Sequence, residues 1–544
     1  MPRLCEQRKQ CVGDSKTQQA PSLRRGPTTR LFIITPMTFQ QLLEGAEVLS
    51  QSGNPSVTGV EHDSRRVGPG KVFVAMKGET SDGNDFIDKA IAAGAVSVVS
   101  DSAVEVPRPG LAWAQVLHGR RALARLSANF YKRPAERIAN TGITGTNGKS
   151  TTAFLIESIL RAAGRETALV GTIEYHVAGK VLPAPHTTPE ALELNRLLAE
   201  ALTAGVTESV MEVSSHALAQ ERVFGIPFDV AVFTNLTRDH LDYHGNMDDY
   251  FRAKQVLFEG CGTTPPRAAV INADDEHGRQ LLTLSRKNSS VVLSYGLTSG
   301  DFHAESVELT RRGTPFQMIT PSGRIPMWSP MIGQVNVYNA LAASAAGYVR
   351  DCPIGPIAKG IFDLARVPGR FERVDCGQPF TVAVDYAHTD DALRNLTALA
   401  HDFVARAGLN GKVITLFGCG GDRDRAKRPL MGEAAGKGSD FAILTSDNPR
   451  SEDPLAIMND ALVGLQKSGV KYTMEPDRRK AIAIALQQAN PGDIVLLAGK
   501  GHEKVQVTKE GTIPFDDVEV ARESLKALAF DCEGARASSA GKTA

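Results

Sequence analysis

The sequence lacks long hydrophobic runs and has no excess of charge of either sign. No apolar run approaches the roughly 18–20 residues that cross a bilayer, and the longest, such as residues 494–498, are typical of buried strands. Lys and Arg together number 61, as do Asp and Glu, so the formal net charge is zero. This balance argues against a surface built to bind nucleic acid or membrane. We therefore predict no nucleic-acid partner and no membrane insertion.

Cysteine is also scarce, and its placement follows no paired pattern. The number is odd and no CxxC motif occurs among the seven, which are Cys5, Cys11, Cys261, Cys352, Cys376, Cys419 and Cys532. Such scatter argues against a disulfide framework and against a zinc site. We therefore expect reduced thiols in a cytoplasmic protein.

The chain is long enough for several domains and has a polar segment at each end. Its 544 residues predict three or four domains, at about 100–200 residues each. Residues 1–36 carry seven basic side chains and two acidic ones. We predict that they are a disordered N-terminal extension, or that the true start is Met37. Residues 532–544, rich in Ala, Ser and Gly, are predicted to be a disordered tail.

Between these ends, short apolar strands alternate with helical patterns, which is typical of a parallel sheet. The predicted strands include 209–213, 228–233, 268–271, 381–384, 413–417, 441–444 and 494–497. Nearly every unusual polar motif directly follows one of them. Since open α/β sheets bind ligands at the carboxyl ends of their strands, we predict an α/β fold whose site is built from several strand ends.

Residues 142–151, with the sequence GITGTNGKST, form a candidate phosphate-binding loop. They follow an apolar segment and open an amphipathic helix, whose N-terminal N–H groups suit phosphate oxygens. Lys149 would reach the β- and γ-phosphates, and Ser150 would ligate Mg²⁺. Ile143 stands where a strict GxxxxGK[ST] motif has glycine, and the alternative is a glycine-rich turn that starts a helix. The predicted ATP contacts in this loop are Gly145, Thr146, Asn147, Gly148, Lys149, Ser150 and Thr151.

Further motifs, in order from about residue 37 to residue 531, resemble those of the Mur ligase family. They include MEVSSHAL from Met211, FTNLTRDHLDYHG from Phe233, YFRAKQVLF from Tyr250, VDYAHTDDAL from Val384, TSDNPRSEDP from Thr445 and GKGHE from Gly499. The set is similar to the MurE type, whose members add the third residue to the UDP-muramoyl peptide of peptidoglycan. The resemblance implies three α/β domains: a uridine-nucleotide-binding domain at 37–113, a P-loop ATPase domain with a parallel sheet at 114–364, and a Rossmann-like amino-acid-binding domain at 365–531.

The resemblance also implies an ATP-dependent ligase that makes an acyl phosphate, which an amine then attacks. Such chemistry asks the protein for cations and metal ligands rather than a covalent nucleophile. The implied catalytic residues are Lys149, Lys254, Glu212 and His240, with Mg²⁺ held by Ser150, Glu212 and His240, and with Lys254 carbamylated as N6-carboxylysine. The alternatives are a helix-cap carboxylate for Glu212, a satisfied polar core residue for His240 and a solvated lysine for Lys254. A Glu in an apolar strand is costly without a partner, which favours the metal role for Glu212.

The resemblance implies three groups of substrate contacts. For the nucleotide they are Asn339 near the adenine, Arg370 near the phosphates and Asp385 at the ribose. For the UDP-sugar peptide they are Ser64, Thr187, Thr188, Ser214, Gln220 and Arg222. For diaminopimelate they are Arg423, Asp447, Asn448, Pro449, Arg450, Gly499 and Glu503, although an isolated Asp-Asn-Pro-Arg is equally a simple turn. Asp390 stands where the family usually has proline, so the shape of the loop after Asp385 is open.

Taken together, the motifs predict transfer of meso-2,6-diaminopimelate to the D-Glu carboxylate of UDP-N-acetylmuramoyl-L-alanyl-D-glutamate (UDP-MurNAc-L-Ala-D-Glu). ATP would be the co-substrate, Mg²⁺ the cofactor, and the protein a monomer. Two alternatives stay open: the same ligase with L-lysine or another amino acid as acceptor, and a non-catalytic nucleotide-binding regulator. A MurF-type ligase, a folylpolyglutamate synthase, or a kinase or motor NTPase would leave some of the motifs unexplained.

Overall fold

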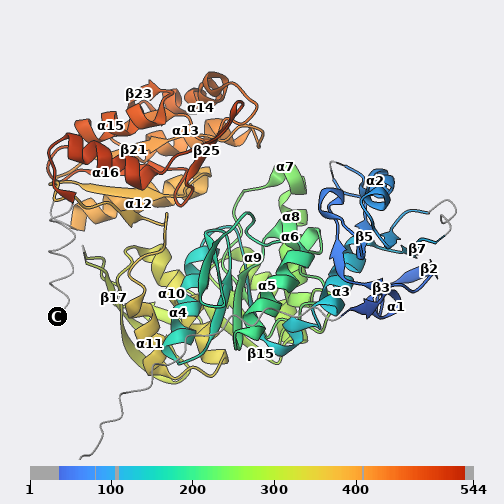
Figure 1. Cartoon of the computed structure of the whole chain (residues 1–544). Helices are drawn as coiled ribbons and strands as arrows, with labels where there is room; N and C mark the ends of the chain where they lie inside the picture. Colours follow the sequence, from blue (N-terminus) through green and yellow to red (C-terminus); the bar gives the residue numbers. More distant parts are fainter. Residues whose placement is uncertain (1–35, 80, 104–109, 311, 407–409, 533–544) are drawn as a thin grey trace, which may run out of the picture. The chain divides into compact units, whose positions relative to one another are not determined.

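A computed structural model describes residues 36–79, 81–103, 110–310, 312–406 and 410–532. Three successive segments of the chain each build their own largely parallel sheet, which confirms the predicted α/β class (Figure 1). Among the described residues, no helix is both long and apolar enough to span a bilayer. The predicted extension, except for Pro36, and the predicted tail after Cys532 lie outside the described residues.

The first segment contains a five-stranded sheet in the order β2-β7-β6-β5-β4. The strands are β2 (Val48–Ser52), β4 (Gly59–Glu61), β5 (Lys71–Ala75), β6 (Ser97–Ser100) and β7 (Ala112–Val116). Strands β4 to β7 are parallel, and β2 pairs with β7 antiparallel at the edge. Helix α3 (Gly119–Phe130) packs into the same apolar core. The boundary that we expect after residue 113 therefore falls inside β7, because this strand still pairs with its neighbours in the first sheet.

The second segment contains an eight-stranded sheet in the order β11-β10-β9-β12-β8-β13-β14-β15. Six strands are parallel, namely β8 (Ala139–Thr144), β9 (Thr167–Val170), β12 (Glu208–Glu212), β13 (Val230–Phe233), β14 (Ala268–Asn272) and β15 (Val291–Tyr295), and β10 (Glu174–Val177) and β11 (Lys180–Pro183) are antiparallel. Strands β12 and β13 are buried throughout, as a parallel sheet covered on both faces requires.

Helices cover this sheet on both faces (Figure 1). One apolar core holds α4 (Lys149–Ala162), α10 (Gln334–Val349) and α11 (Ile354–Asp363), together with part of the antiparallel sheet formed by β16 (His303–Glu305), β17 (Thr314–Thr320) and β18 (Gly323–Ser329). The opposite core holds α5 (Ala191–Thr203), α6 (Ser215–Ala219), α8 (Met247–Glu259) and α9 (Glu276–Asn288). Each helix thus buries its apolar face on the sheet and leaves the strand ends open for polar loops.

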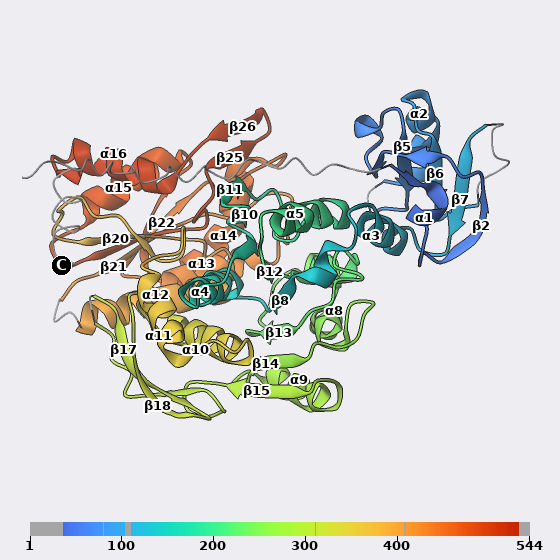
Figure 2. The same ribbon diagram turned by 60° about the horizontal axis from the view of Figure 1, so that its bottom comes forward.

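The third segment contains a six-stranded sheet in the order β19-β20-β24-β21-β22-β23. Its strands are β19 (Glu372–Arg373), β20 (Thr381–Asp385), β21 (Val413–Phe417), β22 (Phe441–Thr445), β23 (Lys471–Glu475) and β24 (Ile494–Ala498). Helices α12 (Asp390–Arg406), α13 (Lys427–Lys437) and α14 (Pro454–Ser468) share one core, and α15 (Arg478–Gln488) and α16 (Asp517–Ala527) share the core on the other face (Figure 2). All seven strands predicted above are confirmed, with small shifts at their ends.

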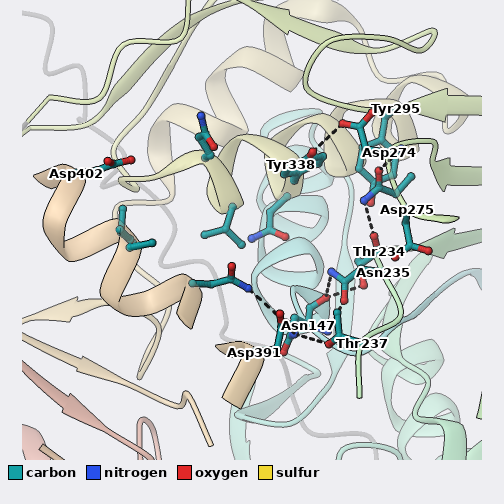
Figure 3. Close-up of a pocket in the computed structure, with 17 residues that line it drawn as sticks. Asn147, Thr234, Asn235, Thr237, Asp274, Asp275, Tyr295, Tyr338, Asp391 and Asp402 are labelled. Atoms are coloured by element: carbon teal, nitrogen blue, oxygen red, sulfur yellow. Dashed lines mark hydrogen bonds between the residues drawn. The ribbon is translucent and has the colours of Figure 1, made fainter. Parts of the chain in front are cut away.

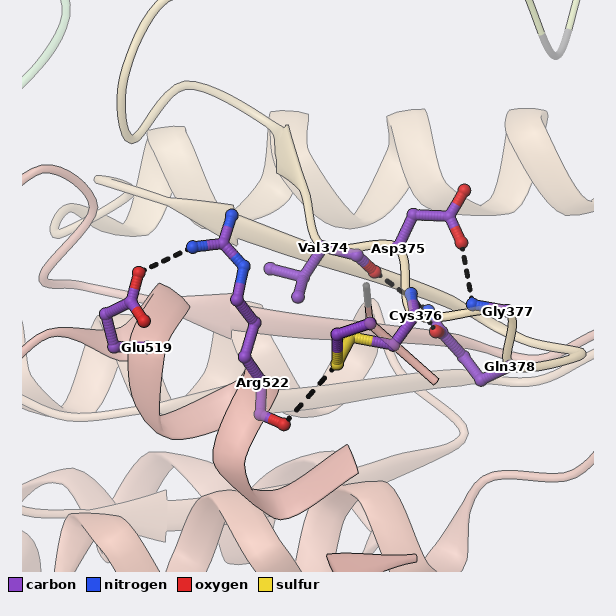
Figure 4. The surroundings of a disulfide bond; sticks show 8 residues. Val374, Asp375, Cys376, Gly377, Gln378, Glu519 and Arg522 are labelled. Carbon is purple, nitrogen blue, oxygen red and sulfur yellow. Dashed lines mark hydrogen bonds and ion pairs between the residues drawn. A yellow bond between two sulfur atoms is a disulfide. The ribbon is translucent and has the colours of Figure 1, made fainter. Parts of the chain in front are cut away.

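The expectation that all thiols are reduced is wrong for two cysteines. Cys376 and Cys532 form a disulfide between the turn after β19 and the segment after α16 (Figure 4). The two residues are 156 positions apart, so only the fold brings them together and no spacing pattern could reveal the pair. Cys532 is thus part of the described fold and not of the predicted tail. Cys261, Cys352 and Cys419 are free and buried, and Cys5 and Cys11 lie outside the described residues.

Loss of this disulfide is expected to lower the free energy of unfolding by about 2–4 kcal/mol, because the crosslink restricts the unfolded chain. The measurement is chemical denaturation of the wild type and of the Cys376→Ala/Cys532→Ala double variant, each with and without dithiothreitol. Reductant should destabilise only the wild type. Equal midpoints for all four samples would contradict the prediction.

His176 lies on β10 between two carboxylates. Its Nδ1 is 2.7 Å from Glu157 Oε2 and its Nε2 is 2.9 Å from Glu174 Oε1. Burial lowers the pKa of His176, but the hydrogen bonds and charges of Glu157 and Glu174 outweigh it, so the pKa is raised overall. A raised pKa in the folded state stabilises the fold below the unfolded value, about 6.5, and this contribution disappears as the pH rises through the folded value.

The free energy of unfolding of His176→Gln is therefore expected to fall below that of the wild type at acidic pH, with the gap narrowing as the pH rises. Denaturation curves at a series of pH values between about 5.5 and 9 measure this gap. His401→Gln is the control, because the His401 ring contacts the carbonyl of Gly438 instead of carboxylates. A gap that stays constant or widens towards alkaline pH would be inconsistent with a charged His176.

Candidate active site

The glycine-rich loop between β8 and α4 adopts a conformation that other residues could not share. Gly145 has a φ of 146° and Gly148 a φ of 86°. A Cβ at Gly145 would lie 1.9 Å from Thr234 Oγ1, and one at Gly148 would lie 2.6 Å from Asn339 Oδ1. The loop is therefore packed against neighbouring polar side chains, and it presents the N–H groups that open α4, as a phosphate-binding loop does.

Two lysines meet at this loop. Lys149 Nζ donates to the carbonyl oxygens of Gly145, at 3.0 Å, and of Thr146, at 2.9 Å. Lys254 Nζ, on α8, donates to the same Gly145 oxygen at 2.9 Å. Lys254 is 1% exposed, and burial together with the charge of Lys149 holds its pKa well below the usual range. The alternative of a solvated lysine is therefore wrong.

Glu212, at the end of β12, gathers hydroxyl groups around its carboxylate. Ser150 Oγ donates to Glu212 Oε2 at 3.0 Å, and Thr172 binds both Glu212 oxygens, through its N–H at 2.8 Å and its Oγ1 at 3.0 Å. Arg370, from the third segment, donates to Ser150 Oγ at 3.2 Å. Since Glu212 is 1% exposed, it is not a surface cap carboxylate.

His240 follows β13 and lines the same cavity as Lys149, Ser150 and Glu212, which has a volume of about 260 Å³. It has a φ of 53° and directly precedes the short helix α7 (Leu241–His244). Its Nε2 is 3.4 Å from Asp239 Oδ2, and its ring centroid is 4.8 Å from that of His216. Burial lowers the pKa of His240 despite the nearby Asp239, which favours a neutral ring that can offer a nitrogen lone pair.

A second cavity, of about 380 Å³, adjoins the first (Figure 3). Asn147 and Asn339 line both cavities, so the expected adenine contact lies where they meet. Tyr338 donates its hydroxyl to Asp274 Oδ2 at 2.7 Å on the wall of the second cavity. Asn147 Nδ2 donates to Asp391 Oδ2 at 3.1 Å, which ties the phosphate loop to α12 of the third segment.

Asp385 is the last residue of β20, and its two oxygens accept from the backbone N–H groups of Phe371, at 2.7 Å, and Ala387, at 2.8 Å. It therefore fixes the turn that carries Arg370, and its contact with a ribose stays a prediction. Asp390, in the place of the usual proline, begins α12 and is paired with Arg394 at 2.5 Å.

The expected UDP-sugar peptide contacts fall into two places. Thr188 Oγ1 donates to the Glu212 carbonyl at 2.8 Å and accepts from the Ser214 N–H at 3.1 Å, which joins these residues to the cavity wall. Thr187 Oγ1 is 3.0 Å from Thr172 Oγ1. Arg222 Nη1 donates to the Thr188 carbonyl at 3.0 Å.

Ser64 belongs to the first segment, where it opens the short helix η1 (Ser64–Arg66). Gln220, in the second segment, connects it to the first segment, because its Nε2 donates to Glu79 Oε1 at 2.8 Å.

The expected diaminopimelate contacts gather at the ends of β21, β22 and β24. Asn448 Nδ2 donates to Glu503 Oε2 at 2.7 Å. Gly499 has a φ of 112°, and a Cβ there would lie 2.7 Å from Asp447 Oδ2. Arg450 Nη1 donates to the carbonyl of Gly421, in the loop of Arg423, at 2.5 Å.

The side chains of Arg450 and Arg423 both lie near Gly420, where a Cβ would be 3.1 Å from Arg450 Nη1 and 3.9 Å from Arg423 Cγ. Burial and the charge of Arg423 lower the pKa of Arg450, as expected for a cation near a second cation. Pro449 contributes a turn, since its carbonyl accepts from the Glu452 N–H at 3.1 Å. Asp-Asn-Pro-Arg therefore forms a turn and also belongs to the cluster of expected diaminopimelate contacts. An anion bound near Arg450 and Arg423 would offset the repulsion between their positive charges.

Sequence reasoning missed Thr172 and Asp391, although each has contacts in the site. Thr172 lies just beyond β9, so the rule that polar residues follow strand ends would have found it. Asp391 lies inside the VDYAHTDDAL motif, next to Asp390, the residue that replaces the usual proline, and nothing in the motif distinguishes it as a contact of the phosphate loop.

Family models for the Mur ligases match three stretches of this chain. The model described as Mur ligase family, catalytic domain, matches residues 56–131, the middle-domain model matches 143–347, and the glutamate ligase domain model matches 369–501. The chain belongs to the Mur ligase family. A Mur ligase is an ATP-dependent enzyme that forms an amide bond, and the phosphate loop, Lys149 and Glu212 are all present here.

Individual Mur ligases are similar to this one over most of their length. The UDP-N-acetylmuramoyl-L-alanyl-D-glutamate–2,6-diaminopimelate ligase of Solibacter usitatus is 56% identical over 476 residues, which cover 87% of this chain and 94% of the relative. The ligase of the same name from Geobacillus thermodenitrificans is 44% identical, over 88% of this chain and 96% of the relative. A solved structure of a ligase of that name has a TM-score of 0.64 at 32% identity, covering 91% of this chain and 100% of its own.

Proposed function

We propose that this Mur ligase joins meso-2,6-diaminopimelate to the D-Glu carboxylate of UDP-MurNAc-L-Ala-D-Glu, a step in peptidoglycan precursor synthesis. The observation that carries the proposal is the meeting of Lys149, Ser150 and Glu212 with Arg370 and Asp385 at one cavity. A phosphate loop, a carboxylate and a guanidinium from different segments are what ATP-driven carboxylate activation needs. The substrates are those named for relatives that are 56% and 44% identical.

The donors in the cavity fit a magnesium ion. Mg²⁺ prefers oxygen ligands, and usually binds one or two carboxylates together with substrate phosphates. Ser150 Oγ and Glu212 Oε2 meet at 3.0 Å in a buried position beside the phosphate loop. These two oxygens, with His240 on the wall of the same cavity, would hold the metal, which would neutralise charge on the phosphates during transfer.

The ligation would proceed in two steps, in which residues of this chain orient the substrates and supply positive charge. The D-Glu carboxylate oxygen attacks the γ-phosphorus of ATP, the bond to the β-phosphate oxygen breaks, and ADP leaves. The amine of the acceptor then attacks the acyl carbon, loses a proton, and expels inorganic phosphate as the amide forms. Lys149, Arg370 and the N–H groups of the phosphate loop would hold the phosphate oxygens as charge shifts onto them.

The burial of Lys254 favours its carbamylation. A neutral amine adds to CO₂, releases a proton and becomes an anionic carbamate. The lowered pKa of Lys254 increases the share of neutral amine, and conversion to an anion removes the repulsion between its ammonium and Lys149. The carbamate would then help to position Mg²⁺.

Arg450→Ala is expected to raise the KM for meso-diaminopimelate by about tenfold to a hundredfold, since loss of one partner of a desolvated charge pair weakens binding strongly. The KM for ATP should change by less than about twofold, because Arg450 lies at the acceptor loops. Arg425→Ala is the control, since this exposed side chain pairs only loosely with Asp460, at 3.3 Å.

The measurement is phosphate release with Mg·ATP and UDP-MurNAc-L-Ala-D-Glu, with meso-diaminopimelate or L-lysine in separate reactions and the product confirmed by mass. Turnover with L-lysine instead would overturn the proposed acceptor while keeping the ligase. An unchanged KM for diaminopimelate in Arg450→Ala would remove Arg450 from the acceptor site. No turnover with either amino acid would favour a nucleotide-binding regulator.

We further propose that the enzyme works as a monomer in the cytoplasm. The proposed location agrees with its use of ATP and a nucleotide-linked substrate, while the Cys376–Cys532 disulfide is unusual for that compartment. Light scattering of the purified protein should give a mass near 58.2 kDa, and twice that mass would contradict the proposal.

A further inference from the structure

Lys500 is a completely buried lysine among the acceptor loops. It follows β24, within the GKGHE motif, and is 0% exposed. The sequence pattern marks its neighbours Gly499 and Glu503 but gives Lys500 no role. Because removing an ammonium from water is costly unless new partners replace it, the groups that surround Lys500 show what it does.

Its partners come from two different loops. Lys500 Nζ donates to Asn448 Oδ1 at 3.0 Å and to Glu503 Oε2 at 3.2 Å, and lies 3.6 Å from Asp447 Oδ1. Asp447 and Asn448 follow β22, whereas Glu503 follows β24. The ammonium therefore ties together two strand-end loops that carry the expected acceptor contacts.

The same ammonium fixes the direction of the Asn448 amide. Asn448 Oδ1 accepts from Lys500 and from the Val507 N–H, at 3.0 Å each. The amide must then direct Nδ2 towards Glu503 Oε2, 2.7 Å away. Both bonds to Glu503 end on Oε2, so its second oxygen, Oε1, lies outside them, and the side chain is still 28% exposed. One face of Glu503 is thus held while the carboxylate stays accessible to a ligand.

Lys500 also sets the charge of the cluster. Asp447 and Glu503 supply the negative charges of the cluster, Arg450 and Arg423 supply positive ones, and Lys500 is the cation in hydrogen-bond contact with Glu503. The far end of meso-diaminopimelate has one carboxylate and one ammonium, whereas the far end of L-lysine has only the ammonium. Without Lys500 the cluster would lose one positive charge beside Glu503, so it would bind the far carboxylate of diaminopimelate less strongly and the far ammonium of lysine more strongly.

We propose that Lys500 is a positioning residue that holds Glu503 and Asn448 in place and sets the preference of the site for an amino acid with a second zwitterionic centre. The inference rests on the proposed ligase function and adds to it the residue that acts behind the direct contacts. It acts through its neighbours, so its loss should change acceptor selection and not the handling of ATP.

The test is steady-state kinetics of full-length Lys500→Met and Lys500→Arg. Lys500→Met is expected to raise the KM for meso-diaminopimelate at least about tenfold, with the KM for ATP within about twofold of wild type. The ratio of kcat/KM for diaminopimelate over L-lysine should fall. Lys500→Arg keeps the charge, so it should retain that ratio even where its bulk raises KM. Lys504→Met, an exposed lysine paired with Asp516, is the matched control and should leave all values unchanged.

A double-variant cycle separates positioning from a general packing role. If Lys500 acts through Glu503, Lys500→Met/Glu503→Gln should lose little more than Glu503→Gln alone. Additive losses, equal rises in KM for all three substrates, or an unchanged preference would overturn the inference. If Lys500→Met does not fold, Lys500→Arg provides the test. Loss of the preference for diaminopimelate in Lys500→Arg would also overturn the inference, because this variant keeps the charge. Wild-type protein that turns over neither amino acid would instead overturn the proposed function itself.

Discussion

Lys254→Ala should lower kcat by about 10²–10³-fold, the range seen when one preorganised electrostatic group is removed from an active site. Lys254 is 1% exposed and donates to the Gly145 carbonyl of the phosphate loop. If it carries a carbamate, the substitution removes an anion that helps to position Mg²⁺. Added acetate should restore part of the activity by supplying a carboxylate in the vacated space.

Phosphate release with increasing acetate measures this rescue. Chloride at equal ionic strength is the first control, because it tests for a general salt effect. Lys359→Ala is the second, since Lys359 is an exposed lysine paired with Asp363 on α11, and it should neither lose activity nor respond to acetate. Near-normal turnover of Lys254→Ala would show that the buried lysine has only a packing role.

Asp517→Ala is expected to destabilise the protein by about 3–5 kcal/mol, because it leaves an uncompensated buried charge. The side chains of Arg478 and Asp517 are both 0% exposed and form a bidentate salt bridge. Arg478 Nε donates to Asp517 Oδ1 at 2.8 Å and Arg478 Nη2 donates to Asp517 Oδ2 at 2.7 Å. Arg478 Nη2 also donates to the Ala498 carbonyl, at 2.9 Å, at the end of β24. The pair therefore joins α15 and α16 to the strand that leads into the acceptor loop.

Chemical denaturation compares Asp517→Ala with Glu519→Ala on the same helix. Glu519 pairs with Arg522 on the surface and is 60% exposed, so its loss should cost about 0–1 kcal/mol. Similar losses for the two variants would show that the buried pair contributes no more than a surface pair.

Several strands of the second and third sheets, among them β12, β13, β21 and β24, could be predicted because apolar runs buried on both faces leave a plain pattern. Strand β2 could not, because four of its five residues are exposed and polar side chains dominate it. Lys149 followed from the phosphate-loop pattern and Glu212 from its place at a strand end, whereas the role of His240 came from the family resemblance. Their convergence with Arg370 needed the structure, since no spacing encodes which strands from separate sheets meet.

Lys500 and the Cys376–Cys532 pair show the same limit for different reasons. A lysine beside glycines is usually solvated, and only the fold reveals that Asn448 and Glu503 enclose this one. The cysteines carry no local signature because their partner is defined by tertiary packing. Carbamylation of Lys254 is chemistry that no amino-acid pattern encodes, and it entered only through the family resemblance.

The direction of the parallel strands divides each sheet into two ends with different tolerance for change. In the third segment Asp385, Asn448 and Gly499 all lie at or beyond the carboxyl ends of strands, whereas Cys376 precedes the amino end of β20. A dye, an affinity tag or a tether joined at the amino ends would leave the reacting groups undisturbed. The turn before β20 is therefore a natural place to attach a reporter or a surface anchor to the working enzyme.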